Sequence, residues 1–306
     1  MKRETQSFYE AAVRRAVEQV ARSLDRSVDL EALARSAALS TFHFHRVFRG
    51  LVGETPLELH RRLRLERAAE WLYRSDPGIL EVALDAGYDS HEAFTRAFRA
   101  AYGVAPSTFR ARPEGACHPG PPTALAARCG LHVRDDRVDL RDLTLVHPGE
   151  VHMDVVIETL PARRLAAVRH VGPYTEISRA FHELGALAAT TGLYGTVEPQ
   201  MLALYHDDPE TTPPSELRSD AALVVRGDAP LPPGLTEVRL PAGEYARATH
   251  IGAYTGLGDA WARFLGGWLP HSGRRLGDGP SYEVYVTDPR TTPTEALRTD
   301  LYVPVG

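Results

Sequence analysis

The chain contains little lysine and cysteine and no long apolar run. Lys2 is its single lysine, and its two cysteines are Cys117 and Cys129. Two cysteines in 306 residues exclude a disulfide-rich secreted scaffold. No apolar run approaches the roughly 20 residues needed to span a bilayer, and no signal peptide precedes Phe8. We therefore expect a cytoplasmic protein without membrane segments.

Net positive charge is also lacking, because 40 acidic residues outnumber 35 basic ones and leave a formal net charge of −5. This balance excludes a protein that binds polyanions over its whole surface. The two halves differ, however: residues 1–113 hold 18 basic and 15 acidic residues, and residues 114–306 hold 17 and 25. We therefore expect any nucleic-acid site in the N-terminal half, where Arg61, Arg62, Arg64 and Arg67 would add local positive charge.

A pattern in this N-terminal half occurs twice, fifty residues apart: S-x3-F-x-R-x-F-R-x3-G-x2-P, at residues 40–56 and 90–106. Each copy predicts a helix with one apolar face and one polar face. A short apolar helix precedes each copy, over residues 30–37 and 79–86, and Ser40 and Ser90 stand where an N-cap is expected. A helix, a tight turn and a capped helix with outward arginines form the helix-turn-helix unit.

Residues 8–112 resemble the DNA-binding domain of the AraC/XylS family of bacterial transcription regulators. The matching residues are L-A-R-S-A-A-L-S-T-F-H-F-H-R-V-F from Leu33, R-L-E-R-A-A from Arg64, A-L-D-A-G-Y-D-S-H-E-A-F-T-R-A-F from Ala83 and G-V-A-P-S from Gly103. The resemblance implies two helix-turn-helix units joined by a long helix over residues 57–73, with both reading helices in successive major grooves. It implies that the DNA contacts come from Thr41, Phe42, His45, Arg46, Arg49, His91, Glu92, Thr95 and Arg96.

Each of these residues also has a plainer interpretation. An outward arginine on an isolated helix is usually a solvated residue, but the duplicated context favours base or phosphate contact for Arg46 and Arg96. Glu92 could accept from cytosine N4, yet the phosphate backbone repels it. The family usually has glycine where this chain has Ala38, which is strained if that position needs a positive φ.

Residues 112–122, R-P-E-G-A-C-H-P-G-P-P, mark a domain boundary. We divide the chain into a DNA-binding domain (1–112), a linker and connector (113–150) and a C-terminal domain (151–306). Residues 124–148 are either an ordered connector packed on one domain or a mobile tether. The spacing of Cys117, His118, Cys129 and His132 matches no common zinc frame, so we expect neither a metal nor another cofactor.

A second repeat, with an offset of eighty residues, covers the C-terminal half. H-V-G-P-Y-T from His170 matches H-I-G-A-Y-T from His250, and Y-x2-D-P-x-T-T-P occurs from both Tyr205 and Tyr285. Each copy predicts a strand (164–170; 245–250), a helix (174–189; 254–268) and two more strands. The expected fold is thus an all-α double helix-turn-helix domain joined to a duplicated strand-helix-strand-strand α/β sheet domain. The helices would cover one face of a shared antiparallel sheet, and the other face would form a groove.

This half resembles the gyrase-inhibitor-like family of small-molecule-binding domains. The matching residues are T-L-P-A-R-R-L-A-A-V-R-H-V-G-P-Y from Thr159, A-L-Y-H-D-D-P from Ala203 and Y-E-V-Y-V-T-D-P from Tyr282. The resemblance implies a lipophilic, often cationic aromatic effector whose charge meets Glu283, where the first repeat has Ala203. Further candidate effector contacts are Tyr205, Tyr254, Trp261, Trp268 and Tyr285. Glu283 could instead be an exposed strand residue or pair with an arginine, and the two tryptophans could belong to the core.

The organisation predicts a ligand-responsive transcription regulator. Its expected partners are double-stranded DNA and a small-molecule effector, with RNA polymerase as a further candidate, and the sequence makes no prediction of oligomeric state. Two alternatives are a hydrolase that uses Glu283 as base and a protein that sequesters toxic compounds. The sequence shows no set of nucleophile, base and orienting residue for the first, and the intact Arg46 and Arg96 argue against the second.

Overall fold

The computed structural model describes residues 2–74, 77–111, 129–145, 153–193, 197–207, 209, 212–228 and 230–306. The chain forms two compact units. The N-terminal unit comprises Tyr9–Ser40 and Phe44–Pro148, and the C-terminal unit comprises Gly149–Gly306 together with Met1–Phe8 and Thr41–His43.

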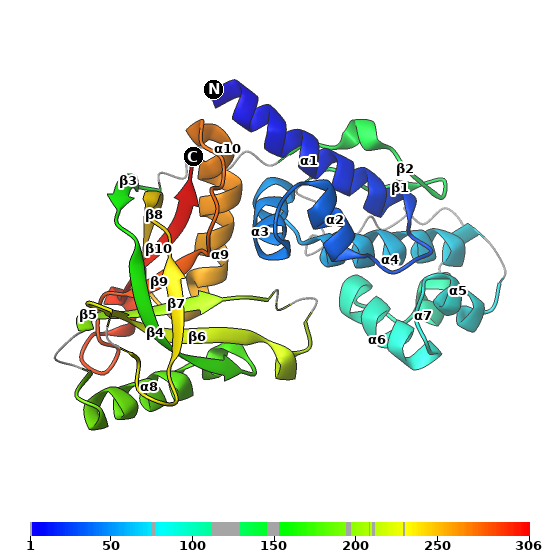
Figure 1. The fold of residues 1–306 in the computed structure, drawn as a ribbon. Coiled ribbons are helices and arrows are strands. Elements are labelled where there is room, and N and C mark those ends of the chain that lie inside the picture. Colours follow the sequence, from blue (N-terminus) through cyan, green and yellow to red (C-terminus); the bar gives the residue numbers. More distant parts are fainter. Residues whose placement is uncertain are drawn as a thin grey trace. The chain divides into compact units, whose positions relative to one another are not determined.

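The N-terminal half of the chain is helical (Figure 1). After the long helix α1 (Lys2–Arg22), the first helix-turn-helix consists of α2 (Leu30–Ser36) and α3 (Thr41–Val52), and the second of α5 (Ile79–Asp85) and α6 (His91–Tyr102). Helix α4 (Pro56–Arg74) joins them, and α7 (Pro106–Arg110) follows the second. The predicted helices over residues 30–37, 57–73 and 79–86 are therefore confirmed, with ends shifted by one residue at most.

Turn and cap residues explain where these helices begin. The Ser90 side chain accepts a hydrogen bond from the Ala93 backbone N–H at 3.1 Å, which is the expected N-cap of α6. In the turn between the two helices of each unit, Gly87 has a φ of +72° and Ala38 a φ of +55°. The position of Ala38 thus does need a positive φ, and an alanine there carries the steric cost that glycine avoids.

The C-terminal unit contains one antiparallel sheet in the order β3-β8-β10-β9-β5-β6-β4-β7. Its strands are β3 (Val155–Leu160), β4 (Arg163–Val171), β5 (Val197–Tyr205), β6 (Arg218–Val225), β7 (Thr236–Leu240), β8 (Gly243–Ile251), β9 (Tyr282–Tyr285) and β10 (Arg298–Val305). The order reads the same from either edge when each strand is exchanged for its counterpart eighty residues away. The pseudo-twofold axis of the duplication therefore passes between β5 and β9.

The helices of the two repeats are α8 (Ser178–Thr190) and a run of α9 (Leu257–Ala262), the π-helical segment η7 (Arg263–Trp268) and α10 (Leu269–Ser272). The predicted duplication is confirmed, but each repeat has one strand more than predicted. The missed strands β3 and β7 lie at the two edges of the sheet. Edge strands bury few side chains, so the period-two signal in V-V-I-E-T-L and T-E-V-R-L is weak.

The prediction of a groove on the sheet face opposite the helices is wrong. Side chains on that face form a buried apolar cluster: Leu165, Ala167, Leu202, Leu204, Ala222, Val224, Leu240, Tyr245, Tyr282 and Val284. The strands change direction strongly from β3 to β5 and β6, so the sheet is curled (Figure 1). Because side chains alternate along a strand, Glu283 lies on the other face, which packs against α8 through Val168, Leu184 and Leu223.

Candidate DNA-reading helices and effector site

Helix α6 presents the polar face predicted for a reading helix. Phe94 and Phe98 are fully buried and anchor its inner side. The predicted contact residues on its outer side are exposed: His91, Glu92 and Arg96, with Thr95 half-buried. Hydrogen bonds from its own backbone N–H and from Ser90 lower the pKa of Glu92. The Glu92 carboxylate thus stabilises the N-terminus of α6, a role that the sequence analysis did not assign to it.

Helix α3 is enclosed to a greater extent. Phe44, Val47 and Phe48 are fully buried, as their apolar spacing predicts. Among the predicted contact residues, Phe42 and His45 are also buried, and Thr41, Arg46 and Arg49 are half-buried.

The arginines of α4 do not all add positive charge to the surface. Arg62 is 3% exposed and Arg67 is 7% exposed. Arg62 pairs with Glu54 and Glu66, and Arg67 pairs with Asp25 at 2.8 Å. The expectation of a local phosphate-binding cluster is therefore wrong for these two, since arginines neutralised in this way attract phosphate weakly.

Glu283 in the C-terminal unit is the centre of the candidate effector site. Its side chain is buried, and its carboxylate accepts hydrogen bonds from Trp261 Nε1 and the Tyr285 hydroxyl, both at 2.8 Å. The interpretation of Glu283 as an exposed strand residue is therefore wrong. These two donors are neutral groups, and their hydrogen bonds stabilise the ionised form of the carboxylate.

Three pairs of aromatic residues, related by the eighty-residue offset, surround this carboxylate. The pairs are Tyr174 with Tyr254, Phe181 with Trp261, and Tyr205 with Tyr285. Tyr174 packs on Tyr205 with ring centroids 4.7 Å apart, and Tyr254 packs on Tyr285 at 5.3 Å. Phe181, which belongs to the first repeat, contacts Tyr285 of the second repeat, with ring centroids 5.6 Å apart. Side chains of both repeats therefore form one aromatic shell around Glu283.

A chain of hydroxyl groups crosses the pseudo-twofold axis. The hydroxyl oxygens of Tyr205 and Tyr285 lie 2.8 Å apart, and Tyr285 donates onward to Glu283. Burial, followed by the nearby charge of Glu283, raises the pKa of both tyrosines well above the ordinary value. Both hydroxyls thus stay protonated at neutral pH and remain hydrogen-bond donors.

The structure brings together Glu283, Trp261, Tyr285, Tyr205 and Tyr254 from the predicted set. Trp268 instead packs on Phe264, at a centroid distance of 5.5 Å. Sequence reasoning missed Phe181 and Tyr174, although the offset of eighty places them at the positions of Trp261 and Tyr254.

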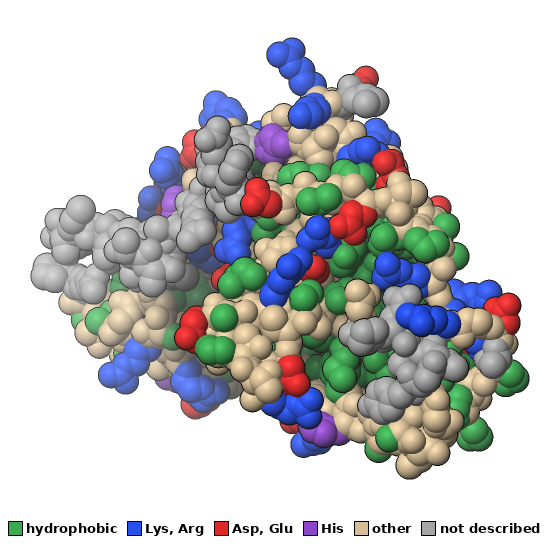
Figure 2. All heavy atoms as spheres, turned by 90° about the vertical axis from the view of Figure 1, so that its left-hand side faces the viewer, with side chains coloured by type: hydrophobic (Ala, Val, Ile, Leu, Met, Phe, Trp, Pro, Cys, Tyr) green, Lys and Arg blue, Asp and Glu red, His purple; other side chains and the backbone are tan. Residues whose placement is uncertain are grey.

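On the face drawn in Figure 2, side chains of both charge signs are interspersed with hydrophobic ones. Within the described part of the chain, no helix is long and apolar enough to cross a membrane. The same residues contain no group of three or more side chains suited to hold a metal ion.

Comparisons with known proteins match both halves of the chain. The family described as "GyrI-like small molecule binding domain" matches residues 153–306, and one described as "Helix-turn-helix domain" matches residues 33–112. A DNA gyrase inhibitor of Yersinia enterocolitica is 38% identical over 140 residues, which cover 44% of this chain and 87% of that protein. An uncharacterized HTH-type transcriptional regulator of Bacillus subtilis, YbfP, is 34% identical over 103 residues, covering 34% of this chain and 35% of YbfP.

One solved structure that aligns with part of the chain is that of an EcmrR–DNA complex. It aligns with a TM-score of 0.43 and 17% identity, covering 50% of this chain and 57% of that one. The chain thus spans a little over half the length of this structural relative.

Proposed function

Because the chain belongs to the GyrI-like family of small-molecule-binding domains and carries an AraC-type helix-turn-helix domain, we propose that an aromatic cation bound beside Glu283 changes the affinity of the protein for DNA. In this division, residues 1–112 bind DNA, residues 151–306 bind the effector and residues 113–150 connect them. RNA polymerase is a further partner in this proposal.

The observation that carries the effector class is a buried carboxylate inside an aromatic shell. A cation that enters the shell gains an ionic interaction with Glu283 and favourable contacts with the faces of Tyr205, Tyr254 and Tyr285. A neutral or anionic ligand gains only the contact area, and an anion is also repelled. The site therefore selects flat or compact aromatic cations.

DNA recognition in this proposal uses α3 and α6 in successive major grooves, with Arg46 and Arg96 contacting bases or phosphates. DNase footprinting on the DNA upstream of its own gene, at two salt concentrations, tests this arrangement. We expect one protected stretch that spans two major grooves on the same side of the duplex. Complete absence of protection would overturn the DNA-binding part of the proposal.

Isothermal titration calorimetry at pH 8 tests the effector class, with N-methylacridinium as the cation and acridine as an uncharged molecule of similar shape. We expect Glu283→Gln to weaken binding of the cation by about 10- to 100-fold, because a charge-assisted interaction of about 1.5–3 kcal/mol is lost. Binding of acridine should change little. Glu295→Gln, an exposed glutamate of the same unit, is the matched control.

Two further measurements, mass spectrometry of the ligand and the DNA affinity with and without the cation, separate regulation from the two alternatives. A hydrolase would return a cleaved ligand, which mass spectrometry detects, and Glu283→Gln would abolish that cleavage. A sequestering protein would bind the cation with no change in DNA affinity. Trp261 and Tyr285 both donate to Glu283 and stabilise its ionised form, which makes the carboxylate better suited to hold a cation than to remove a proton.

A further inference from the structure

One side of helix α4 carries four charged residues at four-residue spacing: Arg62, Glu66, Glu70 and Arg74. Residues four apart share a helix face, so these form a continuous charged stripe. The first three are 3%, 4% and 8% exposed, although α4 is the helix that joins the two helix-turn-helix units. A buried charged stripe needs partners. Arg62 has two of them, Glu54 in the turn before α4 and Glu66 within the stripe, and the other partners come from outside the two helix-turn-helix units.

These outside partners lie in residues 129–145, which form the hairpin of β1 (Val133–Arg134) and β2 (Arg137–Val138) and the short helix η2 (Leu140–Asp142). Glu66 accepts from the Val133 backbone N–H at 2.9 Å, and Arg62 donates to the Leu131 carbonyl at 2.8 Å. Arg74 pairs with Asp135 at 2.5 Å. This segment, which we call the α4 clamp, is an ordered connector packed on one unit, so the tether interpretation is wrong for it.

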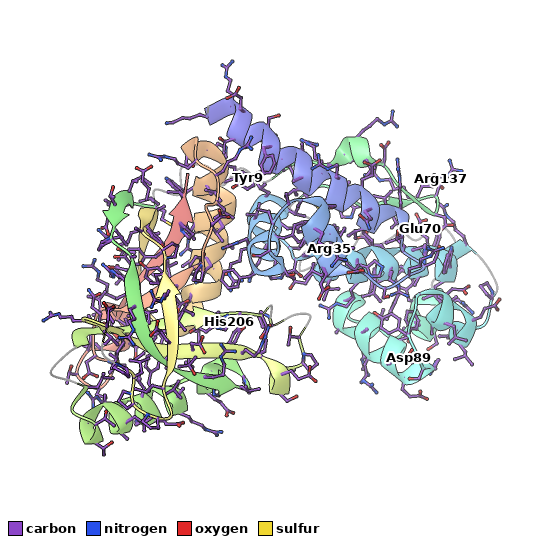
Figure 3. All side chains as sticks on the ribbon, viewed as in Figure 1. Tyr9, Arg35, Glu70, Asp89, Arg137 and His206 are labelled. Carbon is purple, nitrogen blue, oxygen red and sulfur yellow. The ribbon has the colours of Figure 1, made fainter. Side chains whose placement is uncertain are left out.

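The tip of the hairpin shows how specific this docking is. Asp135 and Asp136 have φ values of +51° and +59°, a conformation that costs most residues free energy. It directs both of their backbone N–H groups at the Glu70 carboxylate, at 3.2 and 3.0 Å. Figure 3 shows Glu70 on α4 beside the hairpin that carries Arg137. Glu70 therefore helps to stabilise a turn conformation that is otherwise unfavourable.

The contact between clamp and helix is mixed in polarity. Leu131, Leu145 and Cys129 are almost fully buried, but the direct bonds to α4 are mostly made by carboxylates and guanidinium groups. Such groups are well hydrated when exposed, so separation of the clamp from α4 costs less than separation of an apolar interface of equal size.

From this we infer that the α4 clamp couples the effector site to the DNA-reading helices. The clamp ends at Leu145, ten residues before β3, which pairs with β8 of the effector-binding sheet. An effector that favours one state of the sheet changes how often the clamp is docked, and docking sets the relative orientation of α3 and α6 through α4. The inference rests on the proposed function.

The test compares Glu70→Ala with Glu81→Ala, an exposed glutamate of α5. The readout is the ratio of DNA dissociation constants with and without saturating N-methylacridinium, on the footprinted site. For the wild type we expect a ratio of about 5- to 150-fold. In Glu70→Ala this ratio should fall at least threefold, while binding of the probe in calorimetry stays unchanged. Arg74→Ala, which removes an exposed anchor and leaves the buried stripe intact, should lower the ratio less.

A second readout reports docking itself. Cys129 is fully buried in the clamp, so its labelling by iodoacetamide in a Cys117→Ser background measures undocking. Glu70→Ala should accelerate labelling by about tenfold, and the probe should change the wild-type rate.

Two failures are distinguishable. If labelling accelerates in Glu70→Ala and the DNA ratio keeps its wild-type value, or if the probe changes DNA affinity but not the labelling rate, the clamp is not the coupling element. If the probe binds but leaves the wild-type DNA affinity unchanged, the proposed regulation itself fails, and the coupling role with it.

Discussion

Glu283 and Ala203 are paired residues on the adjacent strands β9 and β5. The two repeats differ at this strand pair and also at the helix position held by Phe181 in the first repeat and Trp261 in the second. The two differences are related through a hydrogen bond. Trp261 supplies an N–H donor on the side that has the carboxylate, and phenylalanine, which has no donor, occupies the side that has alanine. The sequence predicts Glu283 through its unexpected place within a strand. It does not predict the Trp261 bond, because that depends on which helix turn lies above β9.

Ala38 is a residue at which the backbone stores strain. We expect Ala38→Gly to raise the free energy of unfolding by about 0.5–1 kcal/mol, because relief of the left-handed conformation exceeds the added entropy of the unfolded glycine. Urea denaturation followed by circular dichroism measures this change. Gly87→Ala is the reverse control and should destabilise the protein, since its φ of +72° is strained for alanine and the Arg64 guanidinium would have to move away from the new Cβ. An unchanged midpoint for Ala38→Gly would contradict the strain.

Cys129 should show a pH profile set by its burial. Burial raises the pKa of its thiol to about 11. Alkylation of the folded Cys117→Ser protein should therefore become fast near pH 11, whereas alkylation of the same protein unfolded in urea should become fast near pH 9. The folded pKa lies above the unfolded one. The thiol's contribution to stability is therefore complete below about pH 9 and declines as the pH rises toward 11. A native labelling midpoint near pH 9 would show that Cys129 is not enclosed.

Helices were easier to predict than edge strands and docking surfaces. The apolar spacing in α3 and α6 defines their buried faces, since Phe44, Phe48, Phe94 and Phe98 are all buried. Arg62, Glu66 and Glu70 resembled solvated helix residues, and only the distant segment 129–145 makes them part of an interface. A local pattern carries no information about which remote segment packs on it.

Arg96 lies on the exposed face of α6, and its substitution tests whether that helix reads DNA. We expect Arg96→Ala to weaken binding to the footprinted site by about 1–3 kcal/mol if the side chain contacts a base edge. Binding to unrelated DNA should weaken less. Electrophoretic mobility shifts at several salt concentrations measure both. Arg15→Ala, an exposed arginine of α1, should leave both affinities near the wild-type values, and equal losses for the two variants would indicate a general charge effect.

Duplication gives the C-terminal unit two nearly equivalent half-sites. Ala203 precedes Tyr205 by two residues, as Glu283 precedes Tyr285, and Phe181 occupies the position of Trp261 in the other repeat. The shell of aromatic residues is therefore close to symmetric, and the carboxylate with its indole donor decides on which side of the axis a cation binds. The charge can be moved across the axis by about one strand spacing, 4.7–4.9 Å.

The exchange variant combines Glu283→Ala and Trp261→Phe with Ala203→Glu and Phe181→Trp. The first two substitutions alone should weaken binding of N-methylacridinium by about 10- to 100-fold. Adding the other two should recover most of that loss, because Tyr205 can then donate to the new carboxylate as Tyr285 does to Glu283. Calorimetry measures the affinities, and thermal melting confirms that both variants are folded. If the folded exchange variant binds no better than the double variant, residues outside the three aromatic pairs must determine the position of the cation.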